Sequence, residues 1–410
     1  MRFIAQVMGL MLLTMPWILL GQDRTDIQSS FAETMAQAKG GDPKAQNTLG
    51  LRYAKGIGVP KDEAEALKWF RKAADQGLAD AQNILGNLYF HGLEGVPKDH
   101  AEAEASKWYR KAADQGLAQA QGNLAWMYAN GIGVPKDLAE ALKWYRKAAD
   151  QGLAQAQRNL ARMYANGIGV PKDEAEALKW YRKAADQGDA IAQHNIGNAY
   201  ANGRAGVPKD LDEAVKWYRK AADQGLAEAQ KILGNAYANG GLAGVPKDEA
   251  EAVKWFRKAA DQGDANAQDN LGWMYANGIG VSKDEAQAVK WFRKAADQGH
   301  AIAQAHLRFM YADEVGVPKD EAEAAKWHRK AEENAPRAAA SFNTGTREDG
   351  GFSSGGFSSG GFSSQERMNE AVRQANQQLR KEQEAIGQAI GQGADRGIDH
   401  FFPESFRRSP

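Results

Sequence analysis

The sequence predicts an all-α fold, a solenoid of eight helix pairs, and three observations carry this prediction. A Val-Pro/Ser-Lys-Asp element recurs eight times in the 410 residues, and successive valines are 36 to 38 residues apart. Every copy contains two segments whose apolar residues recur at helical spacing. A helix pair of this length cannot bury its own apolar face, so stacked neighbours must cover it.

The first helix of each unit follows an opening glycine, as in residues 41–56. Ala45, Leu49 and Tyr53 recur at helical spacing and form one apolar face. Asp42 is a suitable N-cap, and Pro43 suits the first turn, where no intrahelical N–H donor is needed. We therefore expect a helix that begins after Asp42 and packs through one face.

The second helix is predicted from the stretch VPKDEAEALKWFRKAADQG, residues 59–77. Asp62 and Glu65 form an Asp-x-x-Glu capping box, and Gly77 suits the left-handed conformation that ends a helix. The same start recurs in the other units at Asp99, Asp137, Asp173, Asp210, Asp248, Asp284 and Asp320. Basic residues beside Trp69 and Phe70 are also typical of nucleic-acid-binding surfaces, but their identical repetition indicates packing.

The units share a pattern of small-Leu-Gly-x-x-Tyr, Gly-x-Gly-Val, Asp, and Ala-x-x-Trp-Tyr-x-Lys-Ala-Ala. This pattern resembles the Sel-one-like repeat (SLR), a relative of the tetratricopeptide repeat, over residues 41–334. The resemblance implies a right-handed α-solenoid of antiparallel helix pairs, in which one helix of each pair lines a concave surface. It also implies an adaptor or scaffold role, because relatives include exported bacterial proteins that engage host or envelope proteins.

Departures from the pattern carry further expectations. The second unit has two extra residues before Trp108, which we expect in a loop or bulge. The last unit has Arg308 in place of Gly or Ala and Glu314 in place of a loop glycine, so we expect it to cap the array. At the other end, residues 22–40 resemble a lone second helix and are expected to cap the first unit.

The two ends of the chain have compositions of their own. Residues 1–21 combine Arg2 with a short apolar run, which predicts a signal peptide and a periplasmic or secreted protein; an uncleaved anchor is the weaker alternative. We expect a Gly/Ser/Phe-rich linker at 335–363 and an amphipathic helix at 364–392. This helix could dock on a partner, pair with a second copy or fold back into the groove. Residues 393–410 are expected to be a disordered tail.

Composition argues against several classes of function. Lys plus Arg and Asp plus Glu each total 52, so the net charge of zero gives no general attraction to nucleic acid. There is no cysteine and no pair of histidines four residues apart, so we expect no metal site and no cofactor. Two Gly-x-Ser-x-Gly matches, at 351–355 and 356–360, lack the strand–turn–helix context of a hydrolase, and no catalytic residue is assigned.

Candidate binding residues lie where the copies disagree. Two positions of the first helix, four residues apart and therefore on one helix face, differ in chemistry between units. From these positions we predict a partner-binding set of Trp126, Arg158, Arg162, His194, Asn198, Lys231, Asn235, Asp269, Trp273 and Phe309. Trp126 and Trp273 are the expected anchors, and the alternative is that they fill gaps against a neighbouring helix.

We therefore predict an exported, non-enzymatic solenoid that binds a protein or peptide through a concave stripe. Nucleic-acid binding and stable membrane insertion after signal removal are not expected. The alternatives are a cell-wall or β-lactam hydrolase and a regulator of an envelope signalling system.

Overall fold

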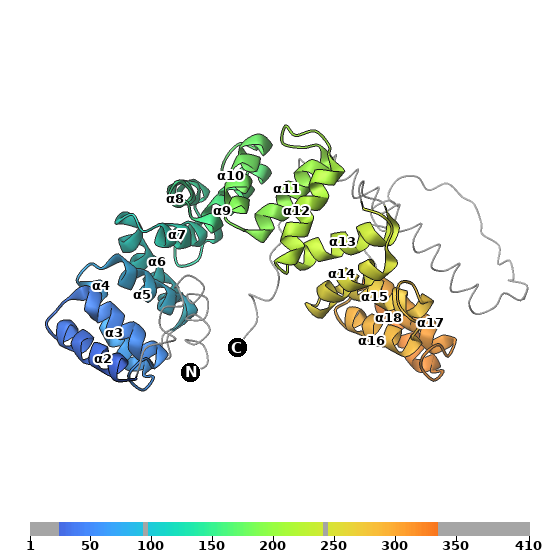
Figure 1. Cartoon of the computed structure of the whole chain (residues 1–410), viewed down its shortest axis with the longest axis horizontal. Helices are drawn as coiled ribbons and strands as arrows, with labels where there is room; N and C mark the ends of the chain where they lie inside the picture. The colour runs from blue at the N-terminus through green and yellow to red at the C-terminus, as the bar shows by residue number, and fades with distance from the viewer. Residues whose placement is uncertain (1–23, 93–96, 241–244, 335–410) are drawn as a thin grey trace, which may run out of the picture. The chain divides into compact units, whose positions relative to one another are not determined.

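The computed structural model describes residues 24–92, 97–240 and 245–334, and every regular element in these ranges is a helix. The chain forms two compact units, unit one up to Pro246 and unit two from Lys247 (Figure 1). The predicted all-α architecture of helix pairs is confirmed. The predicted signal peptide, linker, C-terminal helix and tail (1–21, 335–363, 364–392 and 393–410) lie outside the described residues.

First and second helices alternate along the chain. In unit one the helices are α2 (Arg24–Lys39), α3 (Pro43–Lys55), α4 (Glu63–Asp75), α5 (Ala79–His91), α6 (Lys98–Asp114), α7 (Ala118–Asn130), α8 (Leu138–Asp150), α9 (Ala154–Asn166), α10 (Glu174–Asp186), α11 (Ala190–Asn202), α12 (Leu211–Asp223) and α13 (Ala227–Asn239). In unit two they are α14 (Glu249–Asp261), α15 (Ala265–Asn277), α16 (Glu285–Asp297), α17 (Ala301–Ala312) and α18 (Glu321–Asn334). Odd numbers from α3 onward are first helices, and even numbers from α4 onward are second helices.

Helices that are consecutive in sequence pack against each other within each unit. In unit one this holds for each step from α2 to α13, and in unit two for each step from α14 to α18. Every helix between the first and the last of its unit therefore contacts the helix before it and the helix after it, and one of these two belongs to an adjacent repeat or to the capping helix α2. This is the packing of a solenoid, in which each repeat is stabilised by its neighbours.

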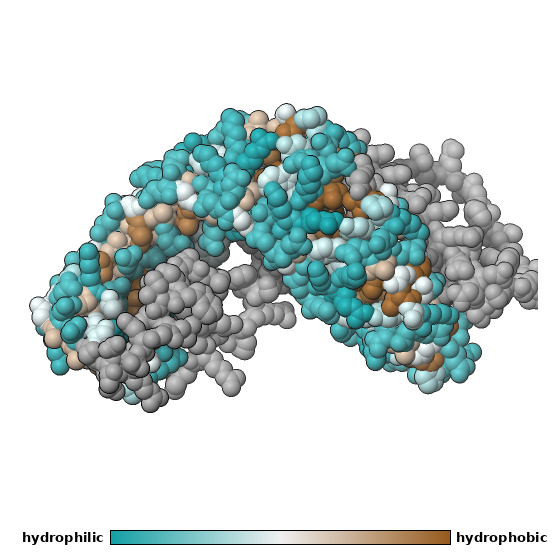
Figure 2. All heavy atoms as spheres, in the orientation of Figure 1, coloured by the Kyte–Doolittle hydropathy of each residue, from teal (hydrophilic) through white to brown (hydrophobic). Residues whose placement is uncertain are grey.

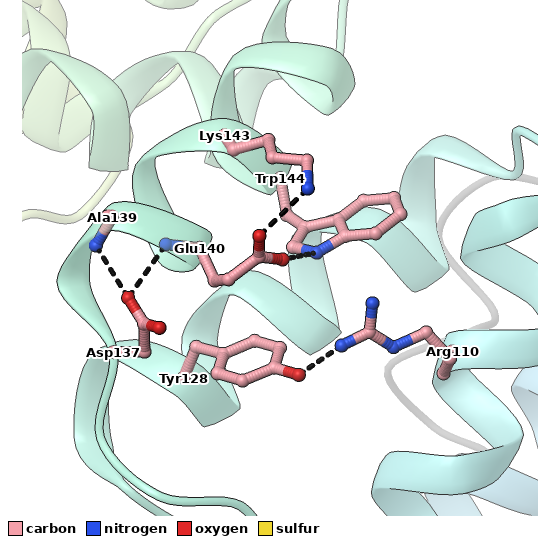
Figure 3. Close-up of polar contacts among 7 residues, drawn as sticks. All are labelled: Arg110, Tyr128, Asp137, Ala139, Glu140, Lys143 and Trp144. Atoms are coloured by element: carbon pink, nitrogen blue, oxygen red, sulfur yellow. Dashed lines mark hydrogen bonds and ion pairs between the residues drawn. The ribbon is translucent and has the colours of Figure 1, made fainter.

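Asp137 shows how the second helices begin (Figure 3). Its carboxylate accepts hydrogen bonds from the backbone N–H groups of Ala139 and Glu140, both at 3.0 Å, which satisfies donors that have no intrahelical acceptor. The glutamate half of the predicted capping box is not formed here. Glu140 instead binds Lys143 Nζ at 2.8 Å and Trp144 Nε1 at 2.9 Å.

Tyr128 explains why the capping box is incomplete. Its backbone carbonyl accepts the Asp137 N–H at 3.0 Å, which is the donor that a capping-box glutamate would bind. Its hydroxyl accepts a hydrogen bond from Arg110 of α6 (Figure 3). The same pairing recurs at Arg146–Tyr164, Arg182–Tyr200, Arg219–Tyr237, Arg257–Tyr275 and Arg293–Tyr311. Each pair joins the second helix of one repeat to the first helix of the next.

The aspartate half of the capping-box prediction is confirmed for seven second helices, and the prediction is wrong for α6. Aspartate caps are formed by Asp62, Asp137, Asp173, Asp210, Asp248, Asp284 and Asp320. In contrast, α6 begins at Lys98 with Pro97 at the N-cap and no side-chain cap, so Asp99 lies in the first turn. The helix has 17 residues rather than 13. The extra residues before Trp108 therefore extend the helix, and the predicted loop or bulge is not formed.

Gly133 lies in the Gly-x-Gly loop between α7 and α8 and shows why this loop requires glycine. Its φ of +64° is left-handed, and a Cβ atom there would lie 2.2 Å from the backbone oxygen of Glu102 on α6. In unit two, Gly280 has φ +66°, and its Cβ would lie 2.1 Å from the Glu249 oxygen. Only glycine permits such a close approach of the loop to the preceding second helix.

The stretch at residues 59–77 is scaffold, as predicted. Trp69 is 8% exposed and Phe70 is 1% exposed, and Lys72 Nζ lies 4.3 Å from the centroid of the Trp69 ring. Lys72 therefore covers a buried aromatic ring, while Lys61 and Lys68 form ion pairs with Glu63 and Glu65. On the face drawn in Figure 2, hydrophilic residues predominate and hydrophobic residues gather in small patches.

At the start of unit one, α2 packs on the first repeat. Ala38 of α2 is buried together with Leu49 and Trp69, and Phe31 and Met35 pack against this cluster. The apolar surface of α3 and α4 that has no preceding repeat is therefore covered by α2.

Candidate protein-binding face

Two positions of each first helix carry side chains that differ between repeats, and we call the surface they form in each unit the varied face. In unit one the pairs are Asn47 and Leu51, Asn83 and Asn87, Gly122 and Trp126, Arg158 and Arg162, His194 and Asn198, and Lys231 and Asn235; in unit two they are Asp269 and Trp273, and Ala305 and Phe309. Asn83 and Asp269 are buried, Asn235 is exposed, and the others are half-buried. Of the predicted binding residues, Asp269 alone is buried from solvent.

Trp126 on α7 combines packing with solvent access. Its ring meets Phe90 of α5 edge to face, with centroids 5.4 Å apart and an interplanar angle of 89°. Aromatic pairs favour this arrangement, so Trp126 contributes to the contact between two repeats. Part of its side chain stays accessible, and both interpretations of this residue, groove anchor and gap filler, fit its placement.

Asparagines beside Trp126 form a hydrogen-bond network. Asn123 Nδ2 donates to Asn83 Oδ1 at 3.2 Å and to Asn87 Oδ1 at 3.4 Å. The Tyr109 hydroxyl donates to Asn87 Oδ1 at 2.7 Å. Side chains of the successive first helices α5 and α7 therefore meet directly.

Two arginines, Arg158 and Arg162, lie one turn apart on α9. Arg158 Nη1 contacts Asp189 Oδ2 at 3.0 Å, and the two side chains are 26% and 9% exposed. The other oxygen of Asp189 accepts the Ala192 N–H at 2.8 Å and caps α11. Asp189 thus starts α11 and also holds Arg158 across the boundary between two repeats.

Tyr145 of α8 and Tyr181 of α10 are the buried neighbours of these arginines. Burial raises the pKa of the Tyr145 hydroxyl far above its usual value and raises the pKa of Tyr181 to about 12, while the charges of Arg162 and Arg158 oppose both increases. Asn159 also lowers the pKa of Tyr145, but the buried hydroxyl makes no hydrogen bond of normal geometry. The arginines therefore lie beside two buried phenol groups, those of Tyr145 and Tyr181.

The next two first helices carry groups whose charges are balanced. The His194 ring lies 5.7 Å from the Tyr218 ring, and burial lowers the pKa of His194, which favours the neutral imidazole. Asn198 Oδ1 accepts a hydrogen bond from the Tyr218 hydroxyl at 2.7 Å. Lys231 Nζ forms an ion pair with Glu228 at 2.7 Å.

The varied face of unit two is mainly aromatic. Trp273 and Phe309 are half-buried, and the indole N–H of Trp273 is buried without a hydrogen-bond acceptor. Asp269 Oδ1 lies 2.9 Å from His306 Nδ1, which joins α15 to α17. The His306 ring also lies 4.5 Å from the ring of Phe292. The carboxylate of this surface is therefore already engaged inside the fold.

Within the described ranges, no group of three or more His, Asp or Glu side chains is placed to hold a metal ion. Across these same residues, no helix has the length and apolar character needed to cross a membrane. The varied face offers amides, half-buried aromatics and two arginines, which are groups suited to non-covalent recognition.

Eight consecutive segments of the chain match the Sel1 repeat family: residues 43–78, 79–117, 118–153, 154–189, 190–226, 227–264, 265–300 and 301–335. The chain belongs to the Sel1 repeat family. The resemblance that the sequence pattern predicted is thereby confirmed.

Two solved structures of Sel1-repeat proteins are similar to this chain. One is c5321 of uropathogenic Escherichia coli, described as a protective antigen displaying an SLR fold; it is 37% identical, with 77% of this chain and 68% of that chain covered and a TM-score of 0.66. The other is a Sel1 repeat protein from Oxalobacter formigenes, 33% identical, with 80% and 97% covered and a TM-score of 0.59. No match was found among curated proteins.

Sel1 repeats generally act as protein-interaction scaffolds, and proteins of this family bind other proteins. The fold is of a non-catalytic scaffold type. At the level of the family, the predicted binding role is therefore supported.

Each Sel1 repeat of this protein also contains a buried glutamine that the sequence analysis missed. The set is Gln46, Gln82, Gln121, Gln157, Gln193, Gln230, Gln268 and Gln304. Gln157 Nε2 donates to the Ala149 carbonyl at 3.1 Å, and Gln157 Oε1 accepts a hydrogen bond from Gln187 Nε2 at 2.8 Å. The signal was available, because glutamine occupies this position in all eight repeats.

Proposed function

We propose that this Sel1-repeat protein is an exported scaffold that binds a protein or peptide segment through the varied face of its first helices. One observation supports the proposal above all. On these helices the buried glutamine is the same in all eight repeats, whereas the varied positions, most of them half-buried, change between amide, aromatic, apolar and charged side chains. A role in packing alone would favour the same residue in each copy.

The test is recovery of binding proteins from a cell-envelope fraction after cross-linking, with wild-type and variant chains compared. We expect the double variant Trp126→Ala/Trp273→Ala to lose the proteins that the wild type captures. Lys68→Ala/Lys254→Ala is the matched control, because these lysines are exposed on second helices, one in each unit; it should capture the same proteins as the wild type.

Loss of folding would give the same result as loss of binding, so thermal unfolding of each variant is measured in parallel. A second variant, Asn235→Arg, changes an exposed residue of the varied face and leaves the core unchanged. Capture that is unaffected by both the tryptophan variant and Asn235→Arg would exclude the varied face as the binding surface.

We also infer export from the charged start and apolar run of residues 1–21. N-terminal sequencing of the protein purified from its native host should give a mature chain that begins near Gln22. A mature chain that starts at Met1 and stays in the cytoplasmic fraction would contradict this inference.

A further inference from the structure

We propose that Asn166, the last residue of α9, is a site of spontaneous covalent modification, and that it deamidates faster than the other Asn-Gly sites of the chain. In this reaction an asparagine that precedes glycine loses ammonia without an enzyme and becomes aspartate or isoaspartate, with water as the only co-reactant. The inference goes beyond the proposed function and does not depend on it.

Three loops of the solenoid have the same sequence. Met-Tyr-Ala-Asn-Gly-Ile-Gly-Val occurs at residues 127–134, 163–170 and 274–281. The asparagines of these loops are the last residues of α7, α9 and α15, namely Asn130, Asn166 and Asn277. Each precedes a glycine, which has no Cβ atom to obstruct ring closure. The reactivity that the local sequence confers should therefore be equal at the three sites.

The backbone is also nearly the same in the three loops. The glycines have φ values of 68°, 67° and 67° and ψ values of 40°, 35° and 38°, for Gly131, Gly167 and Gly278 respectively. Each of these glycines donates its N–H to the carbonyl of the methionine four residues earlier. The nitrogen that must attack is held in the same way in each loop, so the backbone does not distinguish the sites.

The asparagine side chains do distinguish them. Asn130 Nδ2 donates to the Trp126 carbonyl and Asn277 Nδ2 to the Trp273 carbonyl, both at 2.8 Å, and both asparagines are half-buried. Asn166 is exposed, and among the described residues its side-chain amide has no hydrogen-bond partner. The side chain must rotate before Cγ can meet the glycine nitrogen. This rotation breaks a hydrogen bond at Asn130 and Asn277 but not at Asn166.

Two further asparagines that precede glycine show that exposure alone does not make the site. Asn202 and Asn239 are exposed at the ends of α11 and α13. Their Nδ2 groups donate to the backbone carbonyls of Asn198 and Asn235, at 2.8 Å and 3.1 Å. Within residues 24–92, 97–240 and 245–334, Asn166 is the one asparagine before glycine that is both exposed and without a side-chain hydrogen bond.

The reaction needs only groups of the chain and water. The Gly167 nitrogen attacks Cγ of Asn166, the N–Cγ bond forms, the Cγ–Nδ2 bond breaks, and Nδ2 leaves as ammonia with the proton of the glycine nitrogen. Water then opens the resulting succinimide. Attack of water at Cγ gives aspartate, and attack at the main-chain carbonyl carbon gives isoaspartate, in which the main chain continues through Cγ.

The products should loosen one helix pair of unit one. Isoaspartate lengthens the main chain by one methylene group directly before a closely packed loop, in which a Cβ atom on Gly169 would lie 2.6 Å from Leu138 Cβ of α8. Both products also place a carboxylate at the C-terminal end of α9, where the helix dipole disfavours negative charge. We therefore expect the contact between α9 and α10 to weaken as the modification accumulates.

The test is incubation of the full-length protein in a mildly alkaline buffer, followed by tryptic digestion and mass spectrometry. The residues that flank the three loops differ, so each loop gives a distinct peptide. We expect Asn166 to deamidate about three to ten times faster than Asn130 and Asn277, which is the effect of one hydrogen bond of ordinary strength. In denaturant, where the fold no longer distinguishes the loops, the three rates should become equal.

Asn166→Gln and Asn130→Gln form a matched pair of variants, because glutamine keeps the amide and cyclises far more slowly. After the same incubation, hydrogen–deuterium exchange in α9 and α10 should rise in the wild type and in Asn130→Gln, and should not rise in Asn166→Gln. A rise in Asn166→Gln equal to that of the wild type would show that deamidation of Asn166 does not loosen this helix pair.

Three other results would overturn the proposal. The first is equal rates for the three loops in the folded chain, or a higher rate at Asn130 or Asn277. The second is the same ranking in denaturant, since the flanking sequence and not the fold would then decide the rates. The third is an unreactive Asn166 in the folded chain while the denatured chain reacts. None of these results involves a bound partner, so each leaves the proposed function standing.

Discussion

Glu314 follows the C-terminal end of α17 and has a backbone φ of +58°, one of two positive φ values at non-glycine residues in the described ranges; the other is Ala205. At the equivalent position after α3, α7 and α15, the chain has Gly56, Gly131 and Gly278, with φ between +67° and +68°. The left-handed region is unfavourable for a residue with a Cβ atom, so the last repeat holds a local strain that these three repeats avoid.

Replacing Glu314 with glycine should therefore stabilise unit two. The left-handed conformation costs a non-glycine residue about 1–2 kcal/mol, and glycine loses about 0.5–1 kcal/mol through its extra freedom in the unfolded chain. We expect a net gain of about 0.5–1 kcal/mol, measured as a higher midpoint of thermal unfolding. Glu314→Ala is the control, because it removes the charge and keeps the Cβ atom; an equal gain in that variant would show that charge, not backbone strain, is responsible.

At the scale of the helix, the buried glutamine ties each first helix to two second helices. Gln157 on α9 binds the end of α8 through the Ala149 carbonyl and the end of α10 through Gln187. The Ala149 carbonyl also accepts the Gly152 N–H at 3.0 Å, so the loss of Gln157 would remove two hydrogen bonds from the core and leave this carbonyl with a backbone donor. This makes a polar side chain a structural element of the core.

Gln157→Leu should weaken the packing of α9 between α8 and α10. We expect a loss of about 1–3 kcal/mol, seen as faster hydrogen–deuterium exchange in these three helices. Gln155→Leu makes the same substitution at an exposed position of α9 and should have little effect. If both variants exchange at the wild-type rate, the buried amide does not contribute to stability.

At the scale of the whole molecule, repetition decided what the sequence could predict. Eight copies of one pattern predict the helix pairs, the aspartate caps and the buried aromatics, because a feature that recurs in every copy serves the shared fold. The start of α6 was predicted wrongly because Asp99 matches the capping pattern as well as the other aspartates do. The contacts of Arg158 with Asp189 and of Asp269 with His306 join residues of different repeats, so their register is a property of the packed solenoid.

A solenoid should also unfold locally, beginning at the end whose capping helix packs less well. Phe31 of α2 meets Tyr53 of α3 with ring centroids 6.1 Å apart, in the cluster that contains Leu49 and Trp69. Because each repeat contacts only its neighbours, Phe31→Ala should raise hydrogen–deuterium exchange strongly in α3 and α4, weakly in α5, and not at all in α9 and α10. Glu33→Ala, at an exposed position of α2, is the control. An equal rise from α3 to α12 would mean that unit one opens as a single block, and that the repeats are coupled more strongly than nearest-neighbour packing implies.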